Sequence, residues 1–137
     1  MAKTKVQVQR FIDNKDNTIT DTKTDLQWVK DHDALGSQFT KEMTFKQATE
    51  ACKKLNLSGK KDWRLPTREE LLSIVDLTKY NPAINPIFAN THSSWYWTST
   101  PYAWVAGGAW YVGFGYGGVS SFGKGGNDYV RPVRSSQ

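Results

Sequence analysis

Hydrophobic and polar residues alternate along the first third of the chain, a pattern typical of strands. The segment VQVQRFI at residues 6–12 alternates, the turn-forming DNKDN follows, and TIT at residues 18–20 resumes the extended pattern. In DLQWVK, Leu26 and Trp28 fall on one face of a strand. These segments predict a hairpin-like entry into a sheet.

Two apolar stripes with helical spacing follow, after residues 31–43, which carry turn residues and predict a loop. In the first helix Thr44 and Gln47 form a capping box, and the stripe contains Phe45, Ala48, Cys52 and Leu55. In the second helix Thr67 and Glu70 form another capping box. The positions expected to be buried are Leu71 and either Ile74 or Val75, and Leu72 lies at the edge of the buried stripe.

Two Asn-Pro steps in residues 79–88 end the helical region, because the residue before a proline disfavours the α conformation. From Ser94 onward only strands and turns are predicted. The order of strands, two helices and then strands indicates an α+β fold, with two helices beside an antiparallel sheet and a C-terminal β meander.

The meander is unusual in composition, because nine of the eleven glycines lie between Gly107 and Gly126, interleaved with aromatic residues. Glycine weakens the interior of a strand. A two-residue turn at Gly117 and Gly118 would place Tyr116 opposite Val119 and Gly113 opposite Phe122. One face, expected toward the core, would then carry Trp110, Val112, Phe114 and Tyr116. The other, expected outward, would carry Tyr111, Gly113, Gly115, Ser120, Phe122 and Lys124. A structural alternative is that Phe122 lies across Gly113 and supports it.

Length and composition narrow the class of protein. At 137 residues the chain is expected to be a single domain over residues 1–137, and 13% aromatic content supplies a core. The single cysteine, Cys52, excludes an internal disulfide and a cysteine-based zinc cage. The net charge of +5 is modest, so no nucleic-acid partner is expected. Neither a membrane-spanning stretch nor a signal peptide is visible, and no membrane insertion is expected.

An ordered set of sequence blocks runs from about Arg10 to Arg134: DNKDNTITDTKTDLQW, MTFKQATEAC, KDWRLPTREELLSIVD, YNPAINPIF, SSWYWTST and YVRPVR. Together they resemble the Lcl C-terminal-domain family. The resemblance implies a C-type-lectin-like fold. In the entry turn, Lys15 and Asn17 stand where the family usually has glycines, which leaves the turn type open.

The resemblance also implies two kinds of function. Members of the family serve as adhesins, some of them binding sulfated glycans, and others resemble variable proteins diversified by retroelements that mutate adenines. Such retroelements turn asparagine codons AAY into NNY, which spans most amino acids and can encode Gly, Ser, Tyr, Phe, Val, Ala, Asp or Asn, but never Lys, Trp, Met, Gln or Glu. Trp104, Trp110 and Lys124 are then fixed scaffold positions, and the two tryptophans are expected to be apolar anchors. The expected variable, ligand-binding surface comprises Val105, Gly107, Gly108, Gly113, Gly115, Tyr116, Gly118, Ser120, Ser121, Phe122, Gly123, Gly125, Gly126 and Asn127.

Motifs for metal binding and catalysis are weak. The Glu-Pro-Asn or Gln-Pro-Asp and Trp-Asn-Asp motifs of calcium-dependent lectins are missing, and DHD at residues 31–33 is expected to be an exposed loop. Formylglycine-generating enzymes share the broad fold implied by the resemblance, but they use paired cysteines, and this chain has only Cys52. His92 has Ser93 and Ser94 beside it without a pattern that orients it. No enzyme activity, cofactor or metal is expected.

Basic residues suggest a second hypothesis. Lys53, Lys54, Lys60 and Lys61 cluster near the end of the first helix, where lysines also complement the helix dipole. Arg64, between Trp63 and Leu65, is expected to be structural, packing on the ring and binding loop carbonyls.

The sequence therefore favours a non-enzymatic ligand-binding module with a diversified C-terminal surface, recognising a host-cell or surface protein or glycan. It is expected on a virion or at a cell surface. The alternative is a constitutive adhesin that holds sulfated polysaccharide through basic residues. A third class, a structural piece of a virion or surface fibre, predicts oligomer contacts, and the oligomeric state stays open.

Overall fold

The described part of the chain folds into two antiparallel sheets and two α-helices, which confirms the α+β class. The computed structural model describes residues 9–104, 107–124 and 126–136. One sheet has four strands, in the order β1 (Phe11–Asp13), β2 (Thr18–Asp21), β3 (Leu26–Val29) and β7 (Val133–Ser135). The other is the predicted meander, β4 (Trp95–Pro101), β5 (Gly108–Gly113) and β6 (Val119–Gly123). The expectation of one sheet was too simple, because β7 leaves the meander and pairs with β3.

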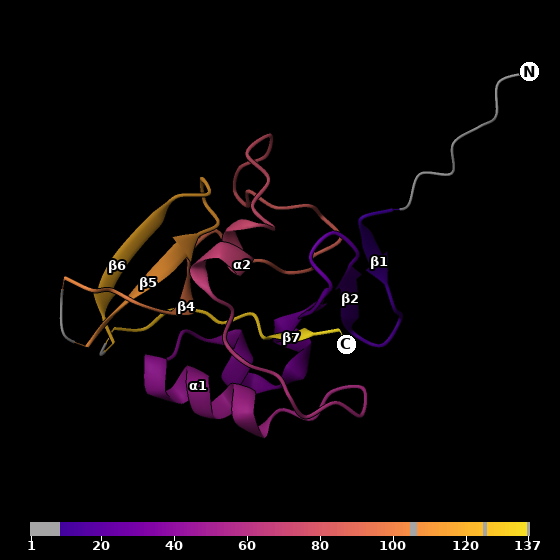
Figure 1. Ribbon diagram of the computed structural model, residues 1–137, viewed down its shortest axis with the longest axis horizontal. Coiled ribbons are helices and arrows are strands. Elements are labelled where there is room, and N and C mark those ends of the chain that lie inside the picture. The colour runs from indigo at the N-terminus through magenta and orange to yellow at the C-terminus, as the bar shows by residue number, and fades with distance from the viewer. Residues whose placement is uncertain (1–8, 105–106, 125, 137) are drawn as a thin grey trace, which may run out of the picture.

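The two sheets lie at opposite ends of the molecule (Figure 1). Helix α2 (Arg68–Leu72) lies between them, and helix α1 (Phe45–Lys54) runs along one side. No helix among the described residues is both long enough and apolar enough to cross a membrane.

Both helices begin where the capping boxes predict. The Thr44 hydroxyl accepts from the Gln47 N–H at 3.2 Å, and the Gln47 side chain accepts from the Thr44 N–H at 2.9 Å. Thr67 and Glu70 make the same pair of bonds at 3.1 and 2.8 Å. Each box satisfies two backbone donors that the first helical turn leaves free. The confirmed capping boxes set the residues at which α1 and α2 begin.

The segment predicted to be a loop forms two 3-10 helices instead, η1 (His32–Leu35) and η2 (Ser37–Thr40). The Asp31 carboxylate caps η1 by accepting from the Asp33 N–H at 3.0 Å. Gly36 separates the two helices with a φ of 131°, a conformation that favours glycine. Sequence periodicity misses helices of this length because each makes barely one turn.

The entry turn keeps a left-handed backbone although it lacks glycine. Lys15 and Asn17 have φ values of 64° and 69°. The Lys15 N–H donates to the Asp13 carboxylate at 2.9 Å. The Asn17 amide both accepts from the Asp31 N–H at 3.0 Å and donates to its carbonyl at 3.1 Å. These side-chain bonds offset the strain of the turn.

The meander separates two hydrophobic clusters, one on each of its faces. Tyr96, Val112 and Phe114 face the cluster that includes Leu71 of α2 and the four-stranded sheet. On the opposite face, Trp97, Ala109 and Val130 pack with residues of α1 and η2, including Phe39, Ala48, Ala51 and Cys52. Because both faces of the meander contribute to cores, only part of one face is left for contact with a ligand.

Candidate ligand-binding surface

The hairpin between β5 and β6 has a longer connection than predicted. Val112 pairs with Val119, and Ala109 pairs with Phe122. Gly113 and Gly118 flank the connection, with the Gly113 N–H donating to the Gly118 carbonyl at 2.8 Å. The predicted two-residue turn and the pairing of Gly113 with Phe122 are therefore wrong.

The physical reason is a loop outside the hairpin. The Phe114 carbonyl accepts from the Ala83 N–H at 2.7 Å, and the Gly115 carbonyl accepts from the Asn81 N–H at 3.0 Å. These bonds take the chain after Gly113 away from β6. Relative to the prediction, each residue of β5 pairs with a residue of β6 four positions earlier in the chain. Because side chains alternate with a period of two, a shift by an even number leaves every side chain on its predicted face.

Tyr111, Gly113 and Ser120 therefore share a face, as predicted. In β4 the partners of Tyr111 and Gly113 are Trp97 and Trp95. Trp97 is fully buried under α1, whereas Trp95, at the far end, is 37% exposed.

The segment after β6 extends this face along the other side of β4. The backbone of Tyr129 pairs with that of Tyr96 in parallel orientation, and the Tyr129 N–H donates to the Trp95 carbonyl at 3.0 Å. Side chains alternate along this segment, so Asp128 and Val130 lie on the side of Trp95 and Trp97. Val130 belongs to the same hydrophobic cluster as Trp97, which supports the assignment. We call the part of this surface not covered by α1 the open face: Trp95, Tyr111, Gly113, Ser120 and Asp128, together with the neighbouring exposed Asn127.

Two hollows flank Trp95 on this surface. A hollow of about 170 Å³ lies on the side of the hairpin turn and is lined by Ser93, Ser94, Trp95, Gly113, Gly115, Tyr116 and Gly118. A second, of about 200 Å³, is lined by Trp95, Tyr111, Gly126, Asn127 and Asp128. The Trp95 and Tyr111 rings meet edge to face with centroids 4.6 Å apart. Trp95 is thus the aromatic wall between two small depressions.

The predicted variable positions differ in exposure. The exposed ones are Gly107, Tyr116, Gly118 and Asn127, and the half-buried ones are Gly115, Ser120, Ser121 and Gly126. Val105 and Gly125 lie outside the described residues, and Phe122 and Gly123 are described only as backbone of β6. Several predicted contact positions therefore surround the two hollows.

Gly108 and Gly113 are buried, which corrects the expectation that they face solvent. A Cβ on Gly113 would lie 2.9 Å from the Trp95 ring, so the aromatic residue that covers this glycine is Trp95, and the alternative with Phe122 is also corrected. Gly108 is buried beside Ala109, which packs under α1.

The aromatic assignments are partly confirmed. Val112 and Phe114 are fully buried as predicted, but Tyr116, expected on the core face, is 80% exposed because it lies in the turn beyond the last strand pair. Trp104 is 87% exposed and is not an apolar anchor. Trp110 is half-buried, with the Arg68 guanidinium 4.7 Å from its ring centroid and Tyr102 edge-on at 5.0 Å.

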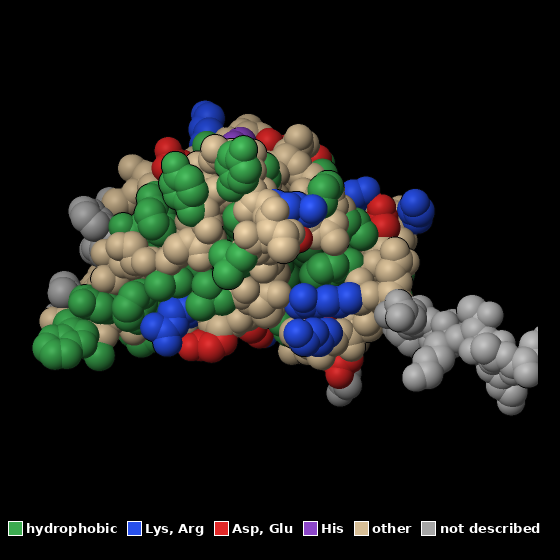
Figure 2. Space-filling model, turned by 90° about the horizontal axis from the view of Figure 1, so that it is seen from above, with side chains coloured by type: hydrophobic (Ala, Val, Ile, Leu, Met, Phe, Trp, Pro, Cys, Tyr) green, Lys and Arg blue, Asp and Glu red, His purple; other side chains and the backbone are tan. Residues whose placement is uncertain are grey.

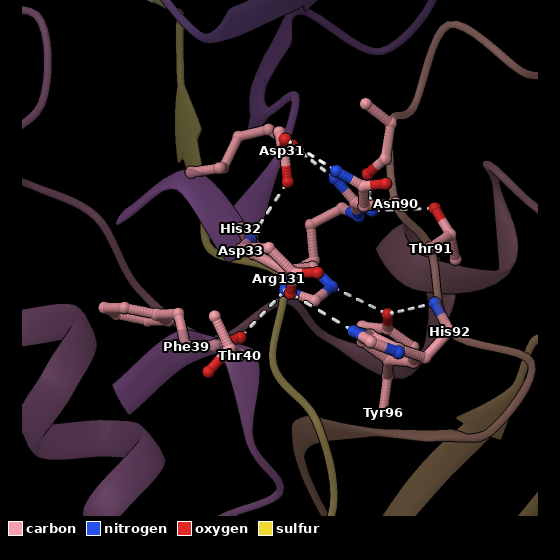
Figure 3. A network of polar contacts seen from close by, with 12 residues as sticks. Asp31, His32, Asp33, Phe39, Thr40, Asn90, Thr91, His92, Tyr96 and Arg131 are labelled. Atoms are coloured by element: carbon pink, nitrogen blue, oxygen red, sulfur yellow. Dashed lines mark hydrogen bonds and ion pairs between the residues drawn. The ribbon is translucent and has the colours of Figure 1, made fainter. Parts of the chain in front are cut away.

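The DHD motif is not an exposed loop, because His32 is completely buried. Figure 3 shows the network of polar contacts around it. Its Nδ1 lies 2.9 Å from the Phe39 carbonyl, which only accepts, so Nδ1 carries the proton. Nε2 then accepts from the Tyr96 hydroxyl at 2.7 Å, and that hydroxyl accepts from the His92 N–H at 2.9 Å. Burial and the nearby Arg131 charge lower the pKa of His32 to about 3, so it is neutral.

A metal site is the other interpretation of this cluster, because ligand atoms of His32, Asp33 and His92 lie within 4.8 Å of one another. The hydrogen bonds of His32 to Phe39 and Tyr96 already use both of its ring nitrogens. His92 instead stacks on Tyr129 at 4.1 Å and approaches the Asp33 carboxylate at 3.1 Å. The arrangement fits a structural network that holds η1 against β4.

Arg131 completes this network from the C-terminal segment. Its guanidinium is fully buried and donates to the carbonyls of Val29 and Lys30 at 2.7 and 2.6 Å and to the Thr91 hydroxyl at 2.7 Å. Figure 3 shows Arg131 between the Asp31 and Thr91 segments. One side chain thereby ties three segments together beneath the open face.

The remaining candidates have structural roles. Cys52 is buried, and burial raises the pKa of its thiol to about 12, which keeps it unreactive. Arg64 makes a two-bond ion pair with Glu70 at 2.7 and 2.8 Å and donates to the Leu65 carbonyl at 3.3 Å. Arg64 is structural as expected, although its main partner is a carboxylate.

The sequence did not single out Trp95 or Asp128. The alternation in WYW, residues 95–97, was a usable signal for Trp95, since it puts Trp95 on the face of Trp97 at the exposed end of β4. Asp128 has no local signal, because its position depends on backbone bonds with Met43 at 2.8 and 3.0 Å.

Comparison with known proteins identifies the family. The model of the Lcl C-terminal domain matches residues 17–134, which is most of the chain, and the chain belongs to this family. Neither the curated proteins nor the solved structures gave a match.

Proposed function

We propose that this Lcl C-terminal domain is a non-enzymatic ligand-binding module whose contact surface is the open face and the adjoining hairpin turn. The observation that carries the proposal is the half-exposed Trp95 between two hollows, next to the exposed Tyr116. Rigid aromatic side chains supply contact area at low entropic cost, and small neighbours allow close approach of a ligand. We also propose that the fold is C-type-lectin-like.

We further propose that the surface is diversified by a retroelement, so that this chain is one variant of many. Support comes from the exposed Gly107, Tyr116, Gly118 and Asn127, whose residue types all arise from NNY codons. The buried Gly108 and Gly113 are constrained by packing and belong to the scaffold. This division makes the variable set smaller than the sequence alone suggests.

A constitutive adhesin for sulfated polysaccharide is the second candidate, because Lys53 and Lys54 are exposed at the end of α1. The open face favours the first candidate, since its charged group is the acidic Asp128 and Glu42 lies near enough to act on it. Figure 2 shows hydrophobic side chains spread over the end of the molecule that holds β4–β6, and most of the visible Lys and Arg side chains toward the other end. Heparin would meet little positive charge there.

Two measurements separate the candidates. An aromatic and backbone-driven surface predicts weak retention on immobilised heparin, whereas a polyanion site predicts strong retention that falls steeply with salt. In the flanking DNA, a diversified protein predicts a reverse-transcriptase gene and a near copy of the codons for residues 104–134 that differs at adenines. A fixed codon block and strong heparin binding would replace the proposal with the adhesin.

The ligand class is a protein or glycan on a virion, host cell or other surface, and this class follows from the family resemblance. A structural piece of a fibre would instead bury the open face against other copies of the chain. Sedimentation of the purified protein distinguishes the two, because the proposed module keeps Trp95 accessible in its free state.

A further inference from the structure

One part of the open face combines aromatic rings with a carboxylate for which the described residues supply no partner. Asp128 is only 8% exposed and lines the hollow of about 200 Å³ together with Trp95 and Tyr111. The parallel pairing beside β4 puts its side chain on the Trp95 side of the sheet. Among the described residues, none forms a hydrogen bond or ion pair with this carboxylate.

Three other carboxylates of the chain have an arginine partner. Asp21 is paired with Arg10 at 3.0 Å, Glu70 with Arg64 at 2.7 Å, and Asp62 with Arg134 at 2.6 Å. The two basic residues nearest to Asp128 in sequence have other partners: the Arg131 guanidinium donates to the carbonyls of Val29 and Lys30. The Lys124 ammonium lies 4.5 Å from the Phe45 ring centroid. Asp128 as a residue is nine-tenths buried, and an ionised carboxylate held there without such a partner is unfavourable unless a ligand supplies the charge.

We propose that the hollow formed by Trp95, Tyr111 and Asp128 is a subsite for an organic cation, such as a lysine side chain presented by a protein ligand. This inference rests on the proposed binding function and names the chemistry of one part of the ligand. The carboxylate supplies the counter-charge, and the Trp95 and Tyr111 rings supply apolar surface for the alkyl stem and a π-face for the ammonium. The volume suits the end of one long side chain rather than a whole small molecule.

The electrostatics of the surroundings point the same way. Glu42, in the segment whose Met43 pairs with Asp128, is the charged group that acts on Asp128, and its negative charge adds to the attraction for a cation. Burial and Glu42 together raise the pKa of Asp128 to about 7. A bound cation favours the ionised form, so binding releases a proton when it occurs below this pKa.

The test uses the whole chain and two small probes that differ in charge. Nα-acetyl-lysine amide and Nα-acetyl-norleucine amide are titrated against the 15N-labelled protein, with the Trp95 indole N–H as the reporter. We expect the lysine probe to shift this signal in a saturable way and the norleucine probe to do so at least about fivefold more weakly, since the ammonium contacts are lost. Equal binding of the two probes, or no binding of either, would overturn the subsite.

Two variants and a pH series test whether Asp128 is the group that binds the lysine probe. Asp128→Asn should weaken the lysine probe by about tenfold, as for loss of a charged hydrogen bond, while Glu50→Gln, a matched loss of charge on the exposed side of α1, should leave it unchanged. In the unmodified chain, affinity should rise about tenfold from pH 6 to pH 8 as Asp128 ionises. A flat pH profile would also overturn the subsite.

The proposed function is judged separately. If neither probe binds but the heparin and DNA tests give the results expected above, the module stands and only the cation subsite fails. If the probes bind and the flanking DNA shows a fixed codon block, the subsite stands and diversification fails.

Discussion

The Trp95 ring lies directly over Gly113 of the neighbouring strand, so close that a Cβ on Gly113 would come within 2.9 Å of Cζ3. The glycine therefore lets the tryptophan lie flat across β5. Trp95 in turn forms the wall of both hollows. The contact makes Gly113 part of the scaffold that presents the binding surface.

The first prediction concerns this contact. Gly113→Ala should lower the free energy of unfolding by about 1–3 kcal/mol, because the added methyl group forces the Trp95 ring to move. At Gly118 a Cβ meets nothing within 4 Å. Gly118→Ala should therefore stay within about 0.5 kcal/mol of the unmodified chain. Denaturant melts compare the two variants, and equal effects would show that the ring does not depend on the glycine.

The second prediction concerns two glycines with positive φ, Gly117 at 85° and Gly107 at 75°. Replacement by alanine strains the backbone at both positions by about 1 kcal/mol. At Gly117 the new Cβ would also come 2.6 Å from Val75 Cγ1, whereas at Gly107 it meets nothing within 4 Å. Gly117→Ala should thus lose at least about 1 kcal/mol more than Gly107→Ala. Thermal melts with a similar loss for both would contradict the packing of the turn on Val75.

The third prediction concerns Arg131. Arg131→Met should lower the free energy of unfolding by about 2–4 kcal/mol, because it leaves the buried carbonyls of Val29 and Lys30 without their donor. Lys53→Met, which removes a charge from the exposed end of α1, is the control and should change little. A small loss for Arg131→Met in urea unfolding would show that the guanidinium does not join the three segments.

The fourth prediction concerns pH, where two buried groups act in opposite directions. The pKa of His32 is lowered to about 3, below its unfolded value of 6.5. The stability that neutral His32 contributes to the fold is therefore fully present above pH 6.5 and is lost as the pH falls. The pKa of Asp128 is raised to about 7 from 3.8. The stability that protonated Asp128 contributes to the fold is therefore fully present below pH 3.8 and is lost as the pH rises. Between pH 4.5 and 6.5 the two slopes oppose each other.

Variants separate these slopes. Asp128→Asn leaves the His32 effect, so stability should rise with pH by about 1.4 kcal/mol per unit. His32→Gln leaves the Asp128 effect, so stability should fall with pH by a similar amount, from a lower starting value because the Tyr96 and Phe39 bonds are disturbed. Urea melts at several pH values give both slopes. If the slopes of the two variants have the same sign, one of the two protonation assignments is wrong.

The sequence predicted the structural features that depend on residues close together in the chain. Thr44 with Gln47 and Thr67 with Glu70 fixed both helix starts, since a capping box needs only residues three positions apart. The alternation along β5 and β6 likewise separated Tyr111 and Gly113 from Val112.

Features set by distant segments were not predictable in this way. The hairpin connection follows from bonds to the Asn81–Ala83 loop, and the burial of His32 follows from Phe39 and Tyr96. The carboxylate of Asp128 reaches the open face only because its backbone pairs with Met43. Each depends on a contact between segments that local patterns do not relate.

Two displayed libraries with NNY codons test directly whether the open face is a variable ligand-binding surface. The first varies Tyr116, Gly118, Ser120 and Asn127 around the hollows, and the second varies the supported positions Gly108, Ala109, Gly113 and Gly117. Each is scored for protease-resistant folded protein and then for binding to immobilised lysozyme as a test ligand. We expect most members of the first library to fold and to yield binders that lose affinity with Trp95→Ala, whereas few members of the second should fold. If the first library unfolds as often as the second, or its binders do not depend on Trp95, the open face is not a variable ligand-binding surface.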